Sequence, residues 1–209
     1  MSDYRHEQSP VRNQGDRQTC VGFAVSAAHD WTRNCRDSMS AEDAIWAGHR
    51  THIIPGTTAT TVKYALEGLD RYRHATEAAW PYGNPQFHAG RPASAQELAA
   101  QRELPKWRVL TELTVDAIEQ QLATGHAVIT SFQVVVSAWR TPPLAQIDAG
   151  PGLVTNGIHA VLAVGTTAGP AQVIIKNSWG TGWGEEGYGY VSERYVQYYL
   201  LRAVALERT

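Results

Sequence analysis

Residues 175–188 read IKNSWGTGWGEEGY, in which a strand-like end leads into Asn177 and then into a loop rich in glycine and tryptophan. The run Val173–Lys176 favours a strand because β-branched residues fit a pleated, half-buried surface. An asparagine directly after a strand can hold an imidazole ring through one ring nitrogen, which sets the tautomer and orientation of that ring. We therefore expect a histidine beside Asn177, with Trp179 shielding their hydrogen bond from water.

A histidine suited to this role lies in a second strand-like run, Ile158–Val164. Side chains alternate between the two faces of a strand, so His159 should point away from the apolar side chains that flank it. The alternatives are a satisfied structural histidine for His159 and a turn asparagine for Asn177. A reactive group elsewhere in the chain would favour the functional interpretation.

Such a group is Cys20, which opens an apolar-rich run of helical length, Cys20–Trp31. A thiol attacks as its thiolate, and a free cysteine with a pKa of about 8.5 is mostly protonated at neutral pH. The N–H groups at a helix start and a neighbouring imidazolium would both lower that pKa. Attack on an amide carbonyl places negative charge on oxygen, for which the Cys20 N–H and the Gln14 amide are candidate donors. The alternatives are a buried structural thiol for Cys20 and a turn residue bonded to its own backbone for Gln14.

In order and spacing, these three segments resemble the papain family of cysteine peptidases. In that family a glutamine lies six residues before the cysteine, as Gln14 does, and the histidine is followed by Ala-Val and a strand that ends in glycine. The run Asn-Ser-Trp-Gly-x-Gly-Trp-Gly recurs at Asn177–Gly184, and Cys20 lies 139 residues before His159, within the ~130–150 of papain-type enzymes. The resemblance implies a nucleophile, a base and acid, an orienting residue and an oxyanion donor, which are Cys20, His159, Asn177 and Gln14 respectively.

The resemblance is less complete around the substrate. Arg17 stands where the family often has a disulfide cysteine, and Val21 stands where tryptophan usually follows the nucleophile. The glycine pair that binds substrate backbone in many members is replaced near Ala59-Thr60. The resemblance still implies a pocket for the second residue before the scissile bond, and the residues expected to contact substrate are Val62, Ser131, Ile158, Ala160 and Trp179.

The two halves of the chain differ in pattern. The first half reads as helical, with Ser40 as the N-cap of a second helix and a third helix over Thr60–Gly68 closed by its glycine. A loop rich in proline and glycine follows over residues 81–92. The second half reads as one short helix, Val115–Thr124, and four strands: Val109–Leu113, Ala127–Val136, Ile158–Val164 and Val173–Lys176.

This arrangement favours an α+β fold. The resemblance implies a single papain-like domain over residues 1–209, with the active-site cleft between a helical lobe and a β-barrel-like lobe. We expect the helical lobe over about residues 11–104 and the β-rich lobe over about residues 105–209, with residues 1–10 crossing to the second lobe. Cys20 should begin the longest buried helix and face His159 across the cleft.

Composition limits the partners and the location. The net charge of −2 over 209 residues gives no electrostatic reason to expect a nucleic acid or a membrane surface as partner. The remaining histidines show no metal-ligand spacing, so we expect no metal and no cofactor. The polar N-terminus and the two cysteines, Cys20 and Cys35, favour a reducing compartment, the cytoplasm, with Cys35 a free structural thiol.

The expected activity is hydrolysis of peptide bonds in an extended peptide or protein substrate, through a covalent acyl-enzyme. The same residues would serve a peptide maturase that passes the acyl group to an amine and so cyclises or ligates a precursor. An inactive peptide-binding homologue is a third alternative, against which the complete catalytic set argues.

Overall fold

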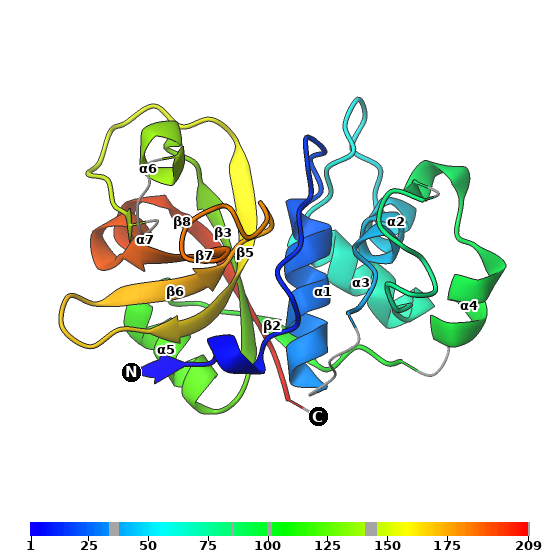
Figure 1. Cartoon of the computed structure of the whole chain (residues 1–209), viewed down its shortest axis with the longest axis horizontal. Coiled ribbons are helices and arrows are strands. Elements are labelled where there is room, and N and C mark those ends of the chain that lie inside the picture. Colours follow the sequence, from blue (N-terminus) through cyan, green and yellow to red (C-terminus); the bar gives the residue numbers. More distant parts are fainter. Residues whose placement is uncertain (34–37, 85, 100–101, 141–145, 209) are drawn as a thin grey trace.

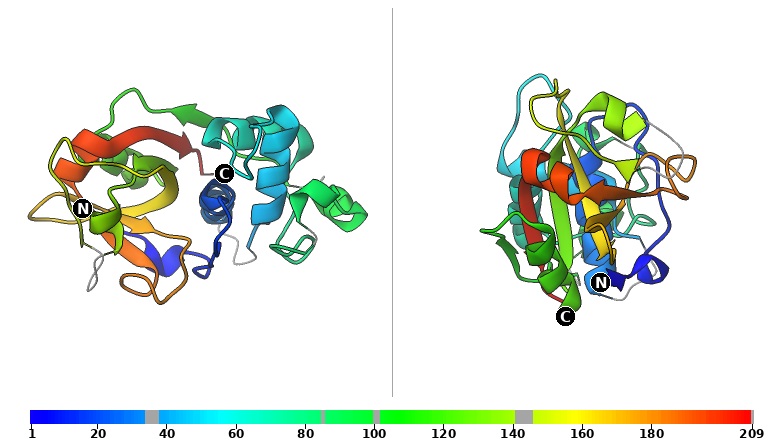
Figure 2. Two further views of the ribbon diagram at one scale, coloured as in Figure 1. Left: turned by 90° about the horizontal axis from the view of Figure 1, so that it is seen from above. Right: turned by 90° about the vertical axis from the view of Figure 1, so that its left-hand side faces the viewer.

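The computed structural model describes residues 1–209 except 34–37, 85, 100–101, 141–145 and 209. It places a group of helices and a sheet side by side (Figure 1). Helix α1 (Cys20–Thr32) lies between the two groups, as the view from above in Figure 2 shows. The expectation of an α+β, two-lobe fold is confirmed.

The helical side contains α1, α2 (Ala41–Thr51), α3 (Val62–Tyr72) and α4 (Ala93–Ala99), with a 3-10 turn, η2 (Phe87–Ala89), before α4. Ser40 caps α2 as predicted, because its side chain accepts a hydrogen bond from the N–H of Asp43. Helix α1 is the longest helix in the part of the chain that the structure describes, and it is buried from Val21 to Thr32. Within the same described ranges, no helix is long and apolar enough to cross a membrane.

The other side is a sheet with the strand order β2-β8-β3-β5-β6-β7-β4, and β1 pairs with β5 off this path. Among the described strands only β4 and β7 pair in parallel. The strands are β1 (Ser2–Asp3), β2 (Trp107–Val109), β3 (Ala127–Gln133), β4 (Gln146–Ile147), β5 (Ile158–Thr166), β6 (Gln172–Lys176), β7 (Tyr188–Ser192) and β8 (Leu200–Leu206). The helices on this side are α5 (Val115–Ala123), α6 (Val136–Arg140) and α7 (Glu193–Tyr199).

Several strand boundaries differ from the predictions. The strands expected at Ile158 and Val173 are present as β5 and β6, but the strand expected at Val109–Leu113 lies earlier, as β2. The run Ala127–Val136 leaves the sheet after Gln133, since the N–H of Val135 bonds to the hydroxyl of Tyr195 instead of to a neighbouring strand. The sheet side also contains strands β7 and β8 and helix α7, which the sequence patterns did not predict.

The N-terminal residues cross to the sheet and then return to α1. Ser2 and Asp3 pair with Thr166 and Gly165 of β5, and η1 (Arg5–Glu7) follows. The arm then reaches the loop after β6, where the N–H of Gln14 donates to the carbonyl of Ser178 at 2.8 Å. This path brings the residues just before Cys20 against the loop that carries Asn177.

Gly68 does not end the third helix, as the sequence had suggested. Helix α3 continues to Tyr72, and Gly68 lies where α3 crosses α2. A Cβ atom at this position would collide with the backbone carbonyl of Ala47. The glycine therefore permits a close approach of two helix backbones, and the helix-stop interpretation was wrong.

We expect Gly68→Ala to destabilise the protein by about 1–3 kcal/mol, because the added methyl group overpacks the crossing. At an exposed helical position the same change would stabilise by about 1 kcal/mol. Denaturant unfolding followed by tryptophan fluorescence measures the difference, with Arg71→Ala on an exposed position of α3 as the control. A Gly68→Ala variant as stable as the wild type would contradict the close crossing.

Candidate active site

Cys20 is the first residue of α1 and is half-buried, whereas the rest of the helix is buried. The side chain of the residue before it, Thr19, makes no cap, and the N–H of Val21 in the first turn bonds to Cys20. The hydroxyl of Thr19 instead contacts that of Tyr82 at 2.6 Å. The sulfur at this helix start therefore lies where backbone N–H groups and the helix dipole favour negative charge.

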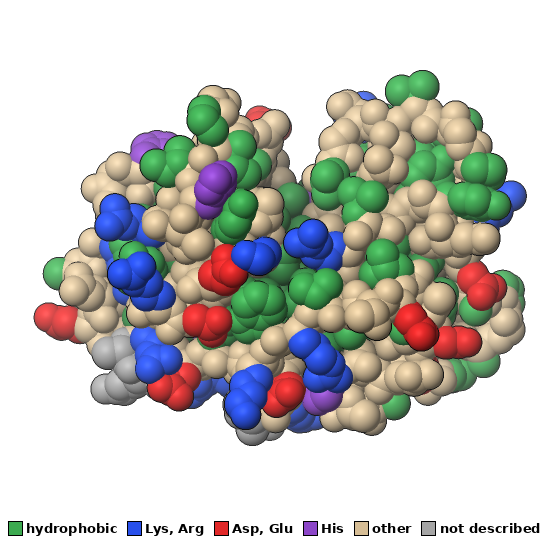
Figure 3. Space-filling view, turned by 180° about the vertical axis from the view of Figure 1, so that it is seen from behind, with side chains coloured by type: hydrophobic (Ala, Val, Ile, Leu, Met, Phe, Trp, Pro, Cys, Tyr) green, Lys and Arg blue, Asp and Glu red, His purple; other side chains and the backbone are tan. Residues whose placement is uncertain are grey.

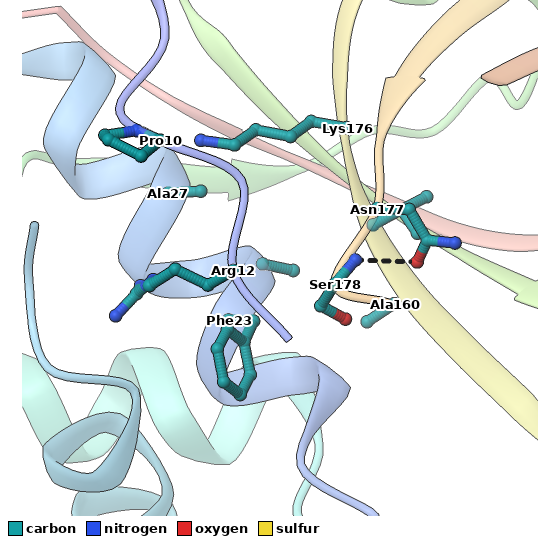
Figure 4. Close-up of a pocket in the computed structure, with 10 residues that line it drawn as sticks. Pro10, Arg12, Phe23, Ala27, Ala160, Lys176, Asn177 and Ser178 are labelled. Atoms are coloured by element: carbon teal, nitrogen blue, oxygen red, sulfur yellow. Dashed lines mark hydrogen bonds between the residues drawn. The ribbon is translucent and has the colours of Figure 1, made fainter. Parts of the chain in front are cut away.

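His159 lies near the start of β5 and is held by Asn177, which directly follows β6. The ring nitrogen Nε2 of His159 lies 2.7 Å from Oδ1 of Asn177, and both residues are buried. Oδ1 of Asn177 also accepts a hydrogen bond from the N–H of Ser178 at 2.7 Å (Figure 4). Because Nε2 faces Asn177, the other ring nitrogen, Nδ1, is left for Cys20.

The surroundings of Cys20 lower the pKa of its thiol. Burial raises that pKa, but a hydrogen bond and the charge of His159 outweigh the effect, with further help from the backbone N–H groups of Ala160 and Val21. Nucleophile, imidazole and amide thus form one chain of contacts from α1 through β5 to the loop after β6. Such a chain can generate a thiolate and can also donate a proton.

Gln14 is buried and fixed at both ends of its side chain. Its Nε2 donates to the carbonyl of Arg17 at 2.8 Å, and its Oε1 accepts from the hydroxyl of Ser178 at 2.6 Å. The bond from Gln14 to the nearby carbonyl of Arg17 is of the kind expected if Gln14 is a turn residue bonded to its own stretch of backbone. An amide nitrogen carries two hydrogens, so one remains beyond the bond to Arg17, and Gln14 lines the same cleft as Cys20.

Aromatic rings enclose the imidazole. Trp179 stacks on His159 with ring centroids 4.7 Å apart, as its predicted shielding role requires. Trp139 meets the same ring edge-on at 5.3 Å and is itself buried. The indole N–H of Trp139 donates to the hydroxyl of Tyr195 at 2.8 Å. The sequence carried no motif around Trp139, and only the turn of the chain after β3 brings it to the site.

A cleft of about 850 Å³ opens over Cys20 and His159 and is lined by both lobes. Figure 3 shows it as the notch at the top of the molecule, seen from behind. All five residues expected to contact substrate line this cleft: Val62, Ser131, Ile158, Ala160 and Trp179. Cys35 lies outside the described residues. Among the residues whose placement is described, no three His, Cys, Asp or Glu side chains gather as metal ligands.

The family described as papain family cysteine protease has a sequence model that matches residues 1–205. This chain belongs to the papain family. An uncharacterized peptidase C1-like protein of Acanthamoeba polyphaga mimivirus is 24% identical over 205 residues, which cover 88% of this chain and 64% of the viral protein. The chain thus spans less than two thirds of that relative.

Solved structures of other proteins share the fold, among them two cysteine proteases. Xylellain, a cysteine protease from Xylella fastidiosa, superposes with a TM-score of 0.83 at 19% identity, covering 96% of this chain and 83% of xylellain. The cysteine protease CMS1MS2 of Carica candamarcensis, solved in complex with E-64, has a TM-score of 0.77 at 24% identity, with 99% and 98% of the two chains covered.

In this papain-family chain, an ion pair occupies the place where the family often has a disulfide cysteine. The guanidinium of Arg17 meets both carboxylate oxygens of the fully buried Glu42, each at 2.8 Å. It also lies over the ring of Tyr82, whose hydroxyl donates to the carbonyl of Gln14 at 2.8 Å. The loop between Gln14 and Cys20 is therefore clamped by charge and hydrogen bonds on the helical side.

A second polar junction joins α1 to β6 behind the site. Lys176 donates to the carbonyl and hydroxyl oxygens of Ser9 at 2.6 and 3.0 Å, and the Ser9 hydroxyl donates to Asp30 of α1 at 2.7 Å. Figure 4 shows Lys176 reaching from β6 toward the arm at Pro10, above a small cavity. Burial raises the pKa of Asp30 to about 6 and lowers the pKa of Lys176 to about 8. The charges of Asp30 and Lys176 favour each other, and the nearby charge of Arg12 favours the ionised form of Asp30 and disfavours that of Lys176.

Lys176→Met should cost about 1–3 kcal/mol of stability near pH 7, because it removes the ammonium group from the junction and leaves Arg12 as the remaining cation that acts on the buried Asp30 carboxylate. The pKa of Asp30 is about 6 in the folded protein, compared with ~3.9 for an ordinary aspartate in the unfolded chain. Between these two pH values the folded protein therefore carries a proton on Asp30 that the unfolded chain has lost. Near pH 5 the carboxyl group takes up that proton, and the penalty in the variant should shrink. Denaturant unfolding at both pH values measures this.

The control is Lys106→Met, which changes an exposed lysine in the same way. It should alter stability by no more than about 0.5 kcal/mol at either pH. A Lys176→Met penalty that is the same at both pH values would show that Asp30 is not the group left uncompensated.

Proposed function

We propose that this chain is a cysteine peptidase that hydrolyses peptide bonds through a Cys20–His159–Asn177 set with Gln14 as oxyanion donor. The observation that carries the proposal is the imidazole of His159, fixed at Nε2 by Asn177 and hydrogen-bonded to a thiol of lowered pKa in an open cleft. Membership of the papain family supports the same reaction.

In the first half-reaction, the Cys20 thiolate attacks the carbonyl carbon of the scissile peptide bond. The Cys20 N–H and the free hydrogen of the Gln14 amide stabilise the oxyanion that forms. The imidazolium of His159 then gives its proton to the leaving amine, which breaks the carbon–nitrogen bond and leaves a thioester on Cys20.

In the second half-reaction, neutral His159 takes a proton from water, and the hydroxide attacks the thioester. The Cys20 thiolate leaves, and the imidazolium is restored. One water molecule is consumed for each bond broken. Asn177 keeps Nδ1 of His159 directed at the sulfur through both steps, and Trp179 keeps solvent from the Asn177 bond.

The substrate in this proposal is a peptide or protein segment that lies extended across the cleft. One wall would come from the lobe of about residues 11–104 and the other from the lobe of about residues 105–209 with residues 1–10, both parts of one catalytic domain. Val62, Ser131, Ile158 and Ala160 would surround the side chain of the second residue before the scissile bond. The cytoplasm is the proposed location, supported by the low cysteine content.

Incubation with a peptide library and mass spectrometry of the products tests the reaction. We expect two fragments whose summed mass exceeds that of the substrate by one water. Cys20→Ala and His159→Ala should abolish turnover, and Asn177→Ala should reduce it. Gln14→Ala should lower the rate by roughly 10²–10³ if its amide is an oxyanion donor.

Lys106→Met serves as the folded control and should retain full activity. Products whose summed mass equals that of the reactants, with no added water, would instead indicate transfer of the acyl group to an amine, as in a peptide maturase that cyclises or ligates its substrate. Full activity of Cys20→Ala on any substrate would contradict the proposal.

A further inference from the structure

The described part of the cleft lining carries four charged side chains: Asp16, Arg17, Arg140 and Arg202. The charge of Arg17 is balanced by the buried carboxylate of Glu42 at 2.8 Å. Asp16 belongs to the loop before α1. The two remaining charges, Arg140 and Arg202, are both positive and both come from the sheet side. The sheet wall of the cleft is therefore electropositive.

Arg202 lies on this wall beside an irregularity in β8. Strand β3 pairs Ser131 with Arg202, but the next residue, Phe132, pairs with Leu200. Leu201 is thus an extra residue on β8, which defines a β-bulge. In a regular strand, neighbouring side chains point to opposite faces, whereas here both Leu201 and Arg202 line the cleft. The regular pairing with Ser131, itself a cleft residue, places Arg202 on the substrate side of the sheet, and the bulge adds Leu201 to the same side.

The register of the sheet places Arg202 near the reacting sulfur. Ser131 pairs with Arg202 on one side and with Ala160 on the other, so the three residues form one row across β8, β3 and β5. With neighbouring strands about 4.8 Å apart, the Cα atoms of Arg202 and Ala160 lie about 10 Å apart. The backbone N–H of Ala160 contacts Cys20. A long side chain at Arg202 can reach a substrate residue bound over Ser131.

The guanidinium of Arg202 has no ion pair with any carboxylate in the described ranges of the chain. By contrast, Arg194 on the same side pairs with Asp148. The residues in one row with Arg202, Ser131 and Ala160, are uncharged, and so is Val62 on the helical wall of the cleft. A guanidinium presents a planar fork of donors that matches a carboxylate. Arg202 is exposed, so its guanidinium is accessible to an anionic side chain of a bound peptide.

We propose that the cleft selects a peptide with an acidic residue whose side chain lies between Val62 and Ser131 and pairs with Arg202. This inference rests on the proposed function, since it names the substrate class of the same site. The apolar part of a glutamate or aspartate side chain contacts the walls, and its carboxylate meets the guanidinium. An arginine or lysine in the same place meets like charge and is rejected.

The test uses a synthetic peptide library in which each position carries Glu, Gln, Lys or Leu, with cleavage followed by mass spectrometry. At one position before the scissile bond, wild-type kcat/KM should be roughly tenfold higher for Glu than for Gln, and lower still for Lys. Arg202→Glu should reverse this order and favour Lys at the same position. Raising the salt concentration should weaken both preferences, because the pair is partly exposed.

Arg71→Glu is the matched control: it makes the same change of charge on an exposed position at the far end of α3 and should keep the preference for Glu. Equal cleavage of Glu and Gln peptides by the wild type, or an unchanged preference in Arg202→Glu, would overturn this inference and leave the peptidase proposal intact. Failure of the wild type to cleave any peptide in the library would overturn both.

Discussion

The 2.7 Å contact between Nε2 of His159 and Oδ1 of Asn177 is the constraint on which the rest of the site depends. It joins the start of β5 to the loop after β6, and it fixes which ring nitrogen faces α1. The tryptophan-rich loop, the N-terminal arm and the start of α1 all assemble around it. Without this bond the imidazole could rotate, and the thiol of Cys20 would lose the neighbour that lowers its pKa.

The two lobes meet through polar junctions as well as apolar packing. Lys176, Ser9 and Asp30 link the sheet, the arm and α1 behind the site, while Arg17 and Glu42 clamp the loop that leads to Cys20. Buried charges of this kind cost desolvation energy and stabilise only when each is paired. Their hydrogen bonds fix the orientation of the groups they join, which apolar packing does not. Each of the two junctions borders a segment that carries Gln14, Cys20 or Asn177.

Local patterns made part of this structure predictable. The cap at Ser40, the helix from Cys20 and the strands around His159 and before Asn177 follow from short-range propensities and periodicity. Gly68 shows the limit of that approach, since a glycine that ends a helix and one that lets two helices touch look alike in sequence. Helix α7 and strand β8 depend on long-range pairing that no short window reveals.

The same limit applies to the site. Cys20, His159 and Asn177 carry motifs, so their segments could be recognised one at a time. Trp139 reaches the imidazole only because the chain leaves the sheet after Gln133. Arg202 shares the cleft face with Ser131 because β8 pairs with β3 in this register. These placements arise from the sheet as a whole, which explains why residue-by-residue inspection overlooked them.

The proposed chemistry requires that His159 holds Cys20 as a thiolate. Its most direct test is the pH titration of thiolate ultraviolet absorbance, taken as the difference between the wild type and Cys20→Ser, and repeated in His159→Ala. The wild type should titrate below the pKa of about 8.5 of a free cysteine. His159→Ala should titrate above that value, because burial of Cys20 remains while the imidazole is gone. A wild-type midpoint at or above that of a free cysteine, unchanged in His159→Ala, would contradict this role of His159.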